Sequence, residues 1–227
     1  MCGRYSLFIP LVDLIGFFNL SRQFNFDLEP RYNIAPRQDV LAIRAESDQR
    51  HLVNLRWGLI PSWAKDDKIG YKTINARSEA AHNTASFRAA FRARRCLLPA
   101  SGFFEWQKQG KEKQPYYFQR GDGNPMALAG LWESWLDRGE GRVVESCTIL
   151  TTDSNELVGQ VHHRMPVILE PEDFDSWLDP KEHQVDRLLP LLQPAAPGVL
   201  DLYPVSRYIN QAANEGPQCV EPVDLGE

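Results

Sequence analysis

Cysteine is scarce in this chain of 227 residues, and its four copies contain no C-x-x-C pair. Isolated cysteines match neither the ligand spacing of a zinc site nor a disulfide framework. Long hydrophobic runs are also missing, because Pro10, Asp13 and Asn19 interrupt the stretch between residues 7 and 20, whereas a membrane-spanning helix needs about 20 apolar residues. We therefore expect reduced thiols, no cofactor, no metal and no membrane partner.

Positive charge is not in excess either. The chain has 25 basic and 30 acidic side chains, which gives a formal net charge of −5. Binding of nucleic acid must therefore use a local basic patch rather than the charge of the whole molecule. The first residues lack the basic and apolar regions of a secretory signal, which favours a cytoplasmic protein. With 43% hydrophobic residues, the composition is that of a folded globular protein.

Short runs rich in β-branched and aromatic residues alternate with turn signals along most of the chain. Such runs predict strands, and the hairpin-like spacing of the glycine-containing turns between them predicts antiparallel pairing. The predicted strands are residues 39–44, 51–57, 95–99, 102–107, 116–120, 126–132, 143–151 and 165–169.

Helical periodicity is confined to a few segments. Ser86 is the expected N-cap of the second predicted helix, and Asp153 or Ser154 that of the third, which we expect to run into residues 161–163. We expect a single α+β domain over residues 1–227, with a mainly antiparallel, β-barrel-like core and a few peripheral helices. The predicted helices are residues 11–20, 86–94, the segment after 153–154, 171–178 and 185–192.

Cys2 is the position with the most distinctive chemistry. Removal of Met1 leaves a cysteine with its free α-amine and its thiol on adjacent carbons. An α-amine has a pKa of about 7.7–8.0, against about 10.4 for lysine, so a useful fraction is an unprotonated nucleophile at neutral pH. Such a group can attack an acyl carbon through sulfur, or condense with an aldehyde and then close a thiazolidine ring. The alternative is that Cys2 is a small buried hydrophobic residue.

Two further segments carry groups that can transfer protons. Glu105 stands in the aromatic run G-F-F-E-W. If it faces inward, burial raises its pKa toward neutrality; if it faces outward, it is a solvated strand residue. His162 and His163 precede Arg164, so they are either structural residues or a proton-transfer pair beside an anion-binding arginine.

Other polar and aromatic residues have the chemistry to hold nucleic acid. Asn75 and Arg77 point the same way on an extended strand, so they can bind a sugar hydroxyl and a phosphate, or belong to a turn with a surface ion pair. The arginines between residues 88 and 95 form either a phosphate track or the solvated face of a helix. Tryptophans such as Trp57 and Trp63 are stacking surfaces for unpaired bases or part of the core.

Seven motifs, in order along the chain, resemble those of the SOS-response-associated peptidase (SRAP) family, whose members cross-link covalently to abasic sites in single-stranded DNA. Single pieces such as N-A-R are weak, but seven in order over nearly the full length make coincidence a poor explanation. The motifs are M-C-G-R-Y at residues 1–5, R-Y-N-I-A-P at 31–36, residues 56–65, I-N-A-R at 74–77, residues 94–106, H-H-R-M-P at 162–166 and Y-P-V-S at 203–206.

The resemblance implies a role for each matched residue. It makes Cys2 the nucleophile, Asn75 the amide that orients the α-amine or the sugar, Glu105 the acid/base carboxylate and His162 the catalytic histidine. Ser101 and Phe104 depart from the Asp and Tyr of many relatives, which puts only fine binding detail in doubt. The positions implied to contact DNA are Arg4, Asn33, Pro36, Trp63, Arg77, Trp106 and Arg164.

The implied function is abasic-site processing. The Cys2 amine attacks the ring-opened aldehyde of an abasic site to give an imine, and sulfur then closes a thiazolidine. The peptidase name describes the removal of Met1, either by self-cleavage or by a host aminopeptidase. The implied partner is single-stranded DNA with an abasic site, and we expect the protein to work as a monomer.

Two other functions compete with this interpretation. Glutamine amidotransferases with an N-terminal nucleophile also begin Cys-Gly after methionine loss, but the downstream motifs of their glutamine site are missing here. The second competitor is a non-catalytic single-strand-binding module in which Trp63 and the arginines bind and Cys2 is idle. That module predicts equal binding to intact and abasic strands.

Overall fold

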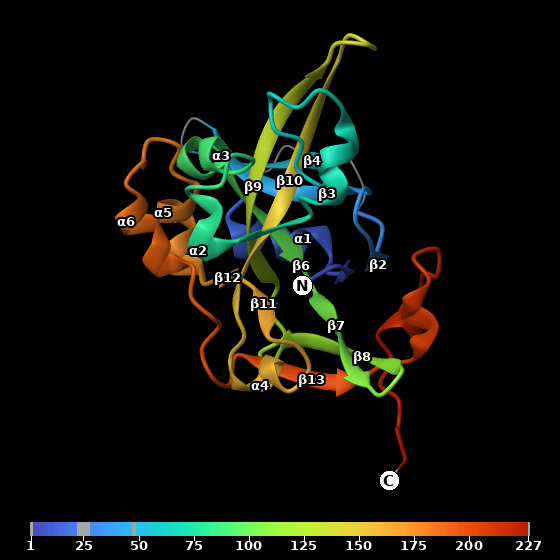
Figure 1. Cartoon of the computed structure of the whole chain (residues 1–227). Helices are drawn as coiled ribbons and strands as arrows, with labels where there is room; N and C mark the ends of the chain where they lie inside the picture. Colours follow the sequence, from blue (N-terminus) through green and yellow to red (C-terminus); the bar gives the residue numbers. More distant parts are fainter. Residues whose placement is uncertain (1, 22–27, 47–48, 227) are drawn as a thin grey trace.

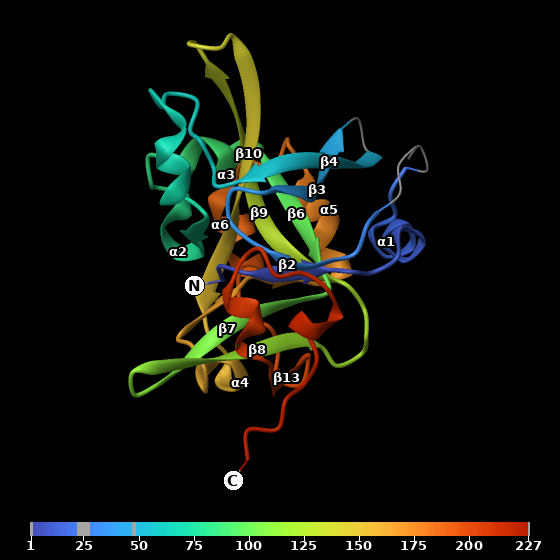
Figure 2. The same ribbon diagram turned by 90° about the vertical axis from the view of Figure 1, so that its right-hand side faces the viewer.

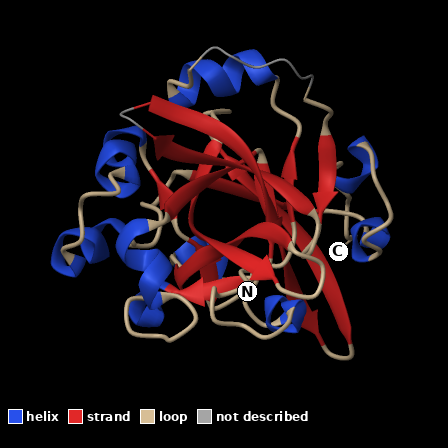
Figure 3. Cartoon of the chain, turned by 90° about the horizontal axis from the view of Figure 1, so that it is seen from above, coloured by secondary structure: helices blue, strands red, loops and turns tan. Residues whose placement is uncertain are grey.

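Five strands form a closed barrel at the centre of the fold (Figure 1, Figure 3). The computed structural model describes residues 2–21, 28–46 and 49–226. The barrel strands are β3 (Asp39–Glu46), β4 (Gln49–Trp57), β6 (Arg95–Ala100), β9 (Met126–Asp137) and β10 (Arg142–Asp153). Antiparallel pairings join β4, β3, β6, β9 and β10 in that order, and a parallel pairing of β10 with β4 closes the ring. The predicted α+β fold with a barrel-like, mainly antiparallel core is confirmed.

A second sheet of five strands lies beside the barrel. Its strands, in spatial order, are β13 (Leu200–Pro204), β8 (Glu112–Arg120), β7 (Gly102–Gln109), β1 (Tyr5–Leu7) and β2 (Arg31–Ile34). After Ser101 the chain passes directly from β6 into β7, as Figure 1 shows. Gly102 is required at this passage, because a Cβ atom there would collide with the Phe118 carbonyl and the Tyr117 ring. The N-terminal strand β1 is therefore held between β7 and β2.

Three short strands extend the barrel sheet. They are β5 (Asn75–Arg77), which pairs in parallel with β10, and β11 (Arg164–Pro166) and β12 (Ile168–Leu169), which pair with β10 and β9. The single strand predicted over 165–169 is thus divided at Val167. Its N–H donates to the Leu150 carbonyl and its carbonyl accepts from the Ala129 N–H, because the segment crosses there from β10 to β9.

The helices are short and lie around the two sheets (Figure 1). Trp57, Phe91 and Trp177 are completely buried. Among the described residues, none of the helices has the length and apolar character to cross a membrane. The α-helices are α1 (Leu11–Phe18), α2 (Ser78–Ala81), α3 (Arg88–Ala93), α4 (Glu156–Gly159), α5 (Phe174–Leu178) and α6 (Val185–Leu188). The 3-10 helices are η1 (Asp67–Tyr71), η2 (Pro171–Asp173), η3 (Leu189–Leu191), η4 (Arg207–Asn210) and η5 (Pro217–Cys219).

Two predicted helix starts are wrong. Ser86 does not cap α3, because the Thr84 carbonyl accepts from the backbone N–H groups of the residues that lead into the helix. Asn155 caps α4, and its Oδ1 accepts from the Val158 N–H at 3.0 Å. Asp153 is unavailable for capping because its carboxylate pairs with an arginine of β11. Helix α4 also ends at Gly159, so residues 161–163 form a loop rather than a helix.

Candidate active site

Cys2 lies on the segment that leads into β1 and is fully buried, with an exposed fraction of 0%. The Phe104 N–H donates to the Arg4 carbonyl at 3.0 Å, which keeps this segment beside β7. The Cys2 thiol lies 3.9 Å from the same carbonyl. Burial raises the pKa of the thiol to about 12, and the nearby charge of Glu105 adds to the rise. The thiol is therefore protonated at neutral pH, and Cys2 and Glu105 lie close together.

Asn75 is placed against Cys2 by strand pairing. Strand β5 runs parallel to β10, with Asn75 opposite Ile149. From that position the Asn75 Nδ2 donates to the Cys2 carbonyl oxygen at 2.8 Å. Asn75 Oδ1 is buried and accepts no hydrogen bond from the described residues. One end of the amide thus fixes the Cys2 backbone, and the other end is an acceptor ready for a donor.

Glu105 faces the interior, as the first of its two sequence-based alternatives requires. It lies on β7 opposite Tyr116 of β8, and only 3% of its surface is exposed. Burial raises the pKa of the carboxyl above its usual range. A carboxylate in this position can therefore hold a proton closer to neutral pH than a surface glutamate does.

His162 lies in the loop between α4 and β11. Its backbone N–H donates to the Val158 carbonyl at 2.8 Å, which ties the loop to the last turn of α4. His162 Nδ1 lies 3.0 Å from the Arg164 backbone nitrogen and 3.1 Å from the Arg164 carbonyl oxygen, so the backbone of Arg164 orients the ring. Burial lowers the pKa of His162, which favours a neutral ring at pH 7. The exposed ring of His163 stacks on it, with the ring centroids 4.4 Å apart.

Glu105 and His162 meet in a cavity of about 380 Å³. Trp106 lines the same cavity, and its indole N–H donates to Asn210 Oδ1 at 2.7 Å. The other two lining residues are Lys113 and Asn210, which the sequence analysis did not identify. Lys113 lies near the turn of the β7–β8 hairpin, and the only sequence signal for Asn210 is its closeness to the Y-P-V-S motif. Among the described residues, no three His, Cys, Asp or Glu side chains converge to hold a metal.

Arg4 and Asn33 form a network behind the cavity. The Arg4 guanidinium donates to Asn33 Oδ1 and, at 2.8 Å, to the Ile209 carbonyl. It also lies over the Trp106 ring, 6.0 Å from the centroid. Asn33 is fully buried, and its Nδ2 donates to the carbonyls of Gln211 (2.9 Å) and Asn214 (2.7 Å). These contacts favour a positioning role for both residues, which connect the N-terminal segment, β2 and the segment that carries Asn210.

The predicted phosphate ligands Arg77 and Arg164 lie in opposite environments. Arg77 is exposed at the end of β5, and no described carboxylate is within ion-pair distance of it. Arg164 is 4% exposed, and its guanidinium donates to Glu79, Asp153 and the Thr151 carbonyl. The guanidinium of Arg77 is therefore accessible to a phosphate group, whereas the contacts of Arg164 favour a structural role.

The remaining predicted contacts lie outside the cavity lining. Trp63 is 59% exposed, and its indole N–H points to the Ala85 carbonyl at 3.4 Å. Pro36 is half-buried in the turn after β2. The arginine-rich run at 88–95 is not one surface, because Arg95 is buried and donates to the Trp177 and Phe91 carbonyls while Arg94 pairs with a carboxylate. A continuous phosphate track along that run is therefore excluded.

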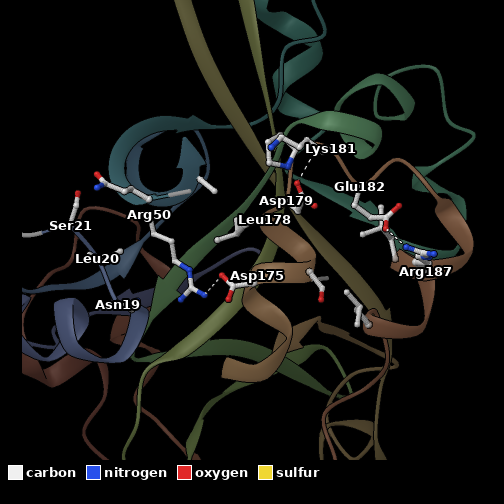
Figure 4. Close-up of a pocket in the computed structure, with 16 residues that line it drawn as sticks. Asn19, Leu20, Ser21, Arg50, Asp175, Leu178, Asp179, Lys181, Glu182 and Arg187 are labelled. Atoms are coloured by element: carbon white, nitrogen blue, oxygen red, sulfur yellow. Dashed lines mark hydrogen bonds and ion pairs between the residues drawn. The ribbon is translucent and has the colours of Figure 1, made fainter. Parts of the chain in front are cut away.

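A larger cavity of about 1220 Å³ lies at the far end of α1, between the β3–β4 hairpin and α5–α6 (Figure 4). Arg50 and Asp175 point toward each other across it, with the two groups 2.6 Å apart, and Arg187 pairs with Glu182 at 3.2 Å. Its lining contains no histidine and no residue that the motifs single out, whereas the smaller cavity is lined by Glu105, Trp106 and His162. The smaller cavity is therefore the candidate active site.

One family model and several known proteins are similar to the chain. The model described as SOS response associated peptidase (SRAP) matches residues 1–212. "Abasic site processing protein YoqW" of Bacillus subtilis (strain 168) is 43% identical over 223 residues, which is 97% of this chain and 99% of that protein. "Abasic site processing protein HMCES" of Gallus gallus is 34% identical and covers 87% of this chain and 67% of its own. A crystal structure of a protein from Bacteroides thetaiotaomicron has a TM-score of 0.85 and 27% identity, over 98% of this chain and 100% of that one.

Proposed function

The chain belongs to the SRAP family, and from that premise we propose that it is an enzyme-like DNA repair protein that processes abasic sites in single-stranded DNA. The name of its relatives, abasic site processing protein, supports the substrate. The observation that carries the proposal for this chain is the hydrogen bond from Asn75 to the Cys2 carbonyl, 2.8 Å long, close to the buried carboxyl of Glu105. An N-terminal aminothiol is thereby held next to a proton-transfer group.

The proposed reaction forms two bonds to one carbon and releases one water. After Met1 has been removed, the Cys2 α-amine adds to the aldehyde carbon of the ring-opened sugar, and loss of water gives an imine. The Cys2 sulfur then adds to the imine carbon, and the thiol proton ends on nitrogen, which closes the thiazolidine. Because burial raises the pKa of the thiol to about 12, the amine is the better nucleophile at neutral pH, and the carbon–nitrogen bond forms first.

Proton transfer is assigned to Glu105 and His162. The pKa of Glu105 is raised, which moves this carboxyl toward the pH range in which it can exchange a proton efficiently, and the pKa of His162 is lowered, which leaves its ring neutral and able to accept a proton. The side chains of Glu105 and His162 both line the cavity. We assign them the protonation of the sugar ring oxygen during opening and of the departing water.

Asn75 orients the reacting amine in this proposal. Its Nδ2 holds the Cys2 carbonyl, and its buried Oδ1 is an acceptor for a proton of the α-amine or for a sugar hydroxyl. Arg77 is exposed on the same side of β5 and is the proposed ligand of the adjacent phosphate. Trp106 at the cavity wall is the proposed stacking surface.

Removal of Met1 is an obligatory step of the proposal. While Met1 is attached, the Cys2 nitrogen belongs to a peptide bond and has no nucleophilic lone pair. We infer that the peptidase activity in the family name acts on this bond, and we assign its cleavage to Cys2, Glu105 and His162. Intact mass of the purified protein should therefore predict activity: a preparation that keeps Met1 forms no adduct.

A denaturing gel tests the proposed function. Processed protein is mixed with single-stranded DNA that contains one abasic site, and with the same strand undamaged. A heat-stable adduct is expected with the abasic strand only, and Cys2→Ala abolishes it. Cys147→Ala, which removes another fully buried thiol, is the matched control and keeps the adduct. Equal binding to both strands without an adduct would instead identify a non-catalytic single-strand-binding module.

A further inference from the structure

Arg37 and Tyr71 form an exposed stacked pair that the proposed reaction does not use. The Arg37 guanidinium lies over the Tyr71 ring, 3.8 Å from its centroid. Tyr71 is nevertheless 61% exposed, so the ring face away from Arg37 is open to solvent. An arginine on one face of the ring holds it in one orientation and leaves the other face free to stack on a ligand.

The backbone of Arg37 is held in an unusual conformation. Its φ is +74°, in the left-handed region that favours glycine. The Arg37 N–H donates to the Trp57 carbonyl at 2.7 Å, which fixes this turn to the end of β4. On the side-chain side, Asp67 Oδ2 lies 3.6 Å from Arg37 and 3.0 Å from Arg56. Arg37 is thus held both through its backbone N–H and through its guanidinium group, and the guanidinium keeps the Tyr71 ring in one orientation.

The surroundings of this pair are basic in a chain that is acidic overall. Asp67 is occupied by two arginines, and Asp66 accepts from the Lys68 N–H at the start of η1. No described carboxylate lies within ion-pair distance of the side-chain ammonium groups of Lys65, Lys68 and Lys72, which are all exposed. An open aromatic ring beside unpaired lysines is the combination that binds single-stranded nucleic acid.

The pair lies near the candidate active site. Tyr71 precedes Asn75 by four residues, a distance of at most about 14 Å along an extended chain. Figure 2 shows segment 61–81, coloured cyan to teal, on the side of the molecule where the chain begins, with the tip of the β7–β8 hairpin on the same side. Exposed Arg77 follows Asn75 by two residues on β5. A strand bound at Cys2 and Arg77 therefore has the Arg37–Tyr71 pair within its reach.

We propose that the Arg37–Tyr71 pair is a binding site for an unpaired base of the strand that flanks the abasic site, with Lys68 and Lys72 on its phosphates. The proposal rests on the proposed function and adds a subsite to it. The base stacks on the open face of Tyr71, opposite the guanidinium. Because every base has a π face, the subsite tolerates any sequence. It therefore makes affinity depend on the length of the DNA strand and not on the identity of the flanking base.

The test measures how affinity grows with strand length. All proteins carry Cys2→Ala, so that only reversible binding is measured by fluorescence anisotropy. A short abasic strand is compared with strands extended by about six nucleotides on the 5′ side or on the 3′ side, within the site size of single-strand binders. We expect one of the two extensions to tighten binding, and Tyr71→Ala to remove about 5- to 150-fold of that gain, the value of one stacked base.

Three further variants make the result specific. Tyr71→Phe keeps the aromatic ring and should retain the gain in affinity from strand extension. Arg37→Gly, which is compatible with the positive φ, should lose part of that gain because the guanidinium no longer holds the Tyr71 ring. Leu136→Ala, at an exposed position on the β9–β10 hairpin, retains the gain and controls for general surface effects. Lys68→Ala lowers the salt dependence of binding to the extended strand by about 0.7 in slope, whereas Tyr71→Ala leaves that slope unchanged.

The outcomes separate this subsite from the proposed function. If the extensions bind Tyr71→Ala and its parent equally, the subsite is refuted, whatever the adduct gel shows. If proteins that retain Cys2 give no adduct with the short strand, the proposed function fails while the length dependence is still measured. The proposal would also be overturned if strand extension tightened binding in a Tyr71-dependent way for intact strands but not for abasic strands.

Discussion

Burial sets the proton affinities of Cys2, Glu105 and His162 in the candidate active site. It raises the pKa of the Cys2 thiol and of the Glu105 carboxyl, and it lowers the pKa of His162. Each shift favours the neutral form, because a charge loses hydration inside the protein. The site therefore contains a protonated thiol, a carboxyl that holds its proton more tightly and a neutral imidazole. In the proposed reaction, this arrangement favours attack by the amine over attack by sulfur.

Glu105→Gln should change both the pH profile of adduct formation and the pH dependence of stability. Because the pKa of Glu105 is raised, the folded chain binds this proton more tightly than the unfolded chain. The resulting stability is present below the unfolded pKa and is lost as pH rises through the raised folded pKa. Between the unfolded and the raised folded pKa of Glu105, we expect the melting temperature of the wild type to fall relative to that of Glu105→Gln as pH rises. Over the same pH range, the rate of adduct formation should change with pH for the wild type and stay constant for the variant. Parallel curves for the two proteins in both measurements would contradict the assignment.

His162→Ala should slow cross-linking without weakening the binding of an undamaged strand. General acid/base groups contribute about 100-fold or more to rate, and a neutral imidazole is a poor phosphate ligand. Single-turnover cross-linking and fluorescence anisotropy are measured side by side. The adjacent His163, which is exposed and stacks on His162, supplies the control His163→Ala with a near wild-type rate. Loss of affinity in proportion to rate would make His162 a binding or folding residue.

Arg77 and Arg164 should respond differently to removal. Arg77→Ala is expected to keep the melting temperature and to lower the salt slope of strand binding by about 0.7, the effect of one lost phosphate contact. Arg164→Ala is expected to destabilise the fold by about 1–3 kcal/mol, because its charged hydrogen bonds to Glu79 and Asp153 are lost. Thermal unfolding measures the stability of both variants, and strand binding at a series of salt concentrations measures their salt slopes. A stable Arg164→Ala protein with a reduced salt slope would restore Arg164 as a phosphate ligand.

At the scale of elements, the long strands follow from the sequence and the shortest ones do not. β3, β4 and β6–β10 contain enough alternating or apolar residues to be recognised individually. β1 and β5 have three residues each, too few for a pattern, and they are strands only because a neighbour pairs with them. β11 and β12 fall largely within one predicted strand, 165–169, and only the fold shows that this strand is divided between two partners. β5 carries Asn75, and the segment leading into β1 carries Cys2. The motifs therefore identify these residues, whereas their contact requires the fold.

The same limit explains why two cavity residues were not predicted. Asn210 and Trp106 are 104 positions apart in the sequence, and no local sequence pattern predicts a contact over such a separation. Lys113 belongs to a hairpin turn region whose charges resemble those of any solvated turn. Conversely, the resemblance assigned DNA contacts to Asn33 and Arg164, whose burial becomes visible only once the surrounding elements are assembled.

Asn33 connects β2 to the segment that follows η4, and Asn33→Ala tests that connection. The substitution leaves the Gln211 and Asn214 carbonyls and the Arg4 guanidinium without their partner. We expect a loss of about 1–3 kcal/mol in stability and faster hydrogen exchange across residues 207–219. Asn83→Ala, at an exposed asparagine, is the control. Unchanged exchange in 207–219 would show that these contacts do not hold the segment.

For the whole molecule, the decisive feature is where the two sheets meet. β1 is held in the second sheet by β7 and β2, whereas β5 belongs to the barrel sheet, and Cys2 lies between them. Cys2 is thereby fixed on both sides, and the proposed reaction needs such a fixed position if its amine is to meet a substrate in one geometry. The net charge of −5 leaves DNA binding to local basic groups such as Arg77 and those around Tyr71.

The most direct test of the central claim is to locate the covalent bond. Adduct formed with an abasic strand is digested with nuclease and trypsin, and the peptide that carries the sugar remnant is identified by mass spectrometry. The thiazolidine predicts the peptide Cys2–Arg4, without Met1, with the mass of peptide plus remnant minus one water. A remnant on a peptide that retains Met1, or on a lysine peptide such as the one with Lys113, would contradict it.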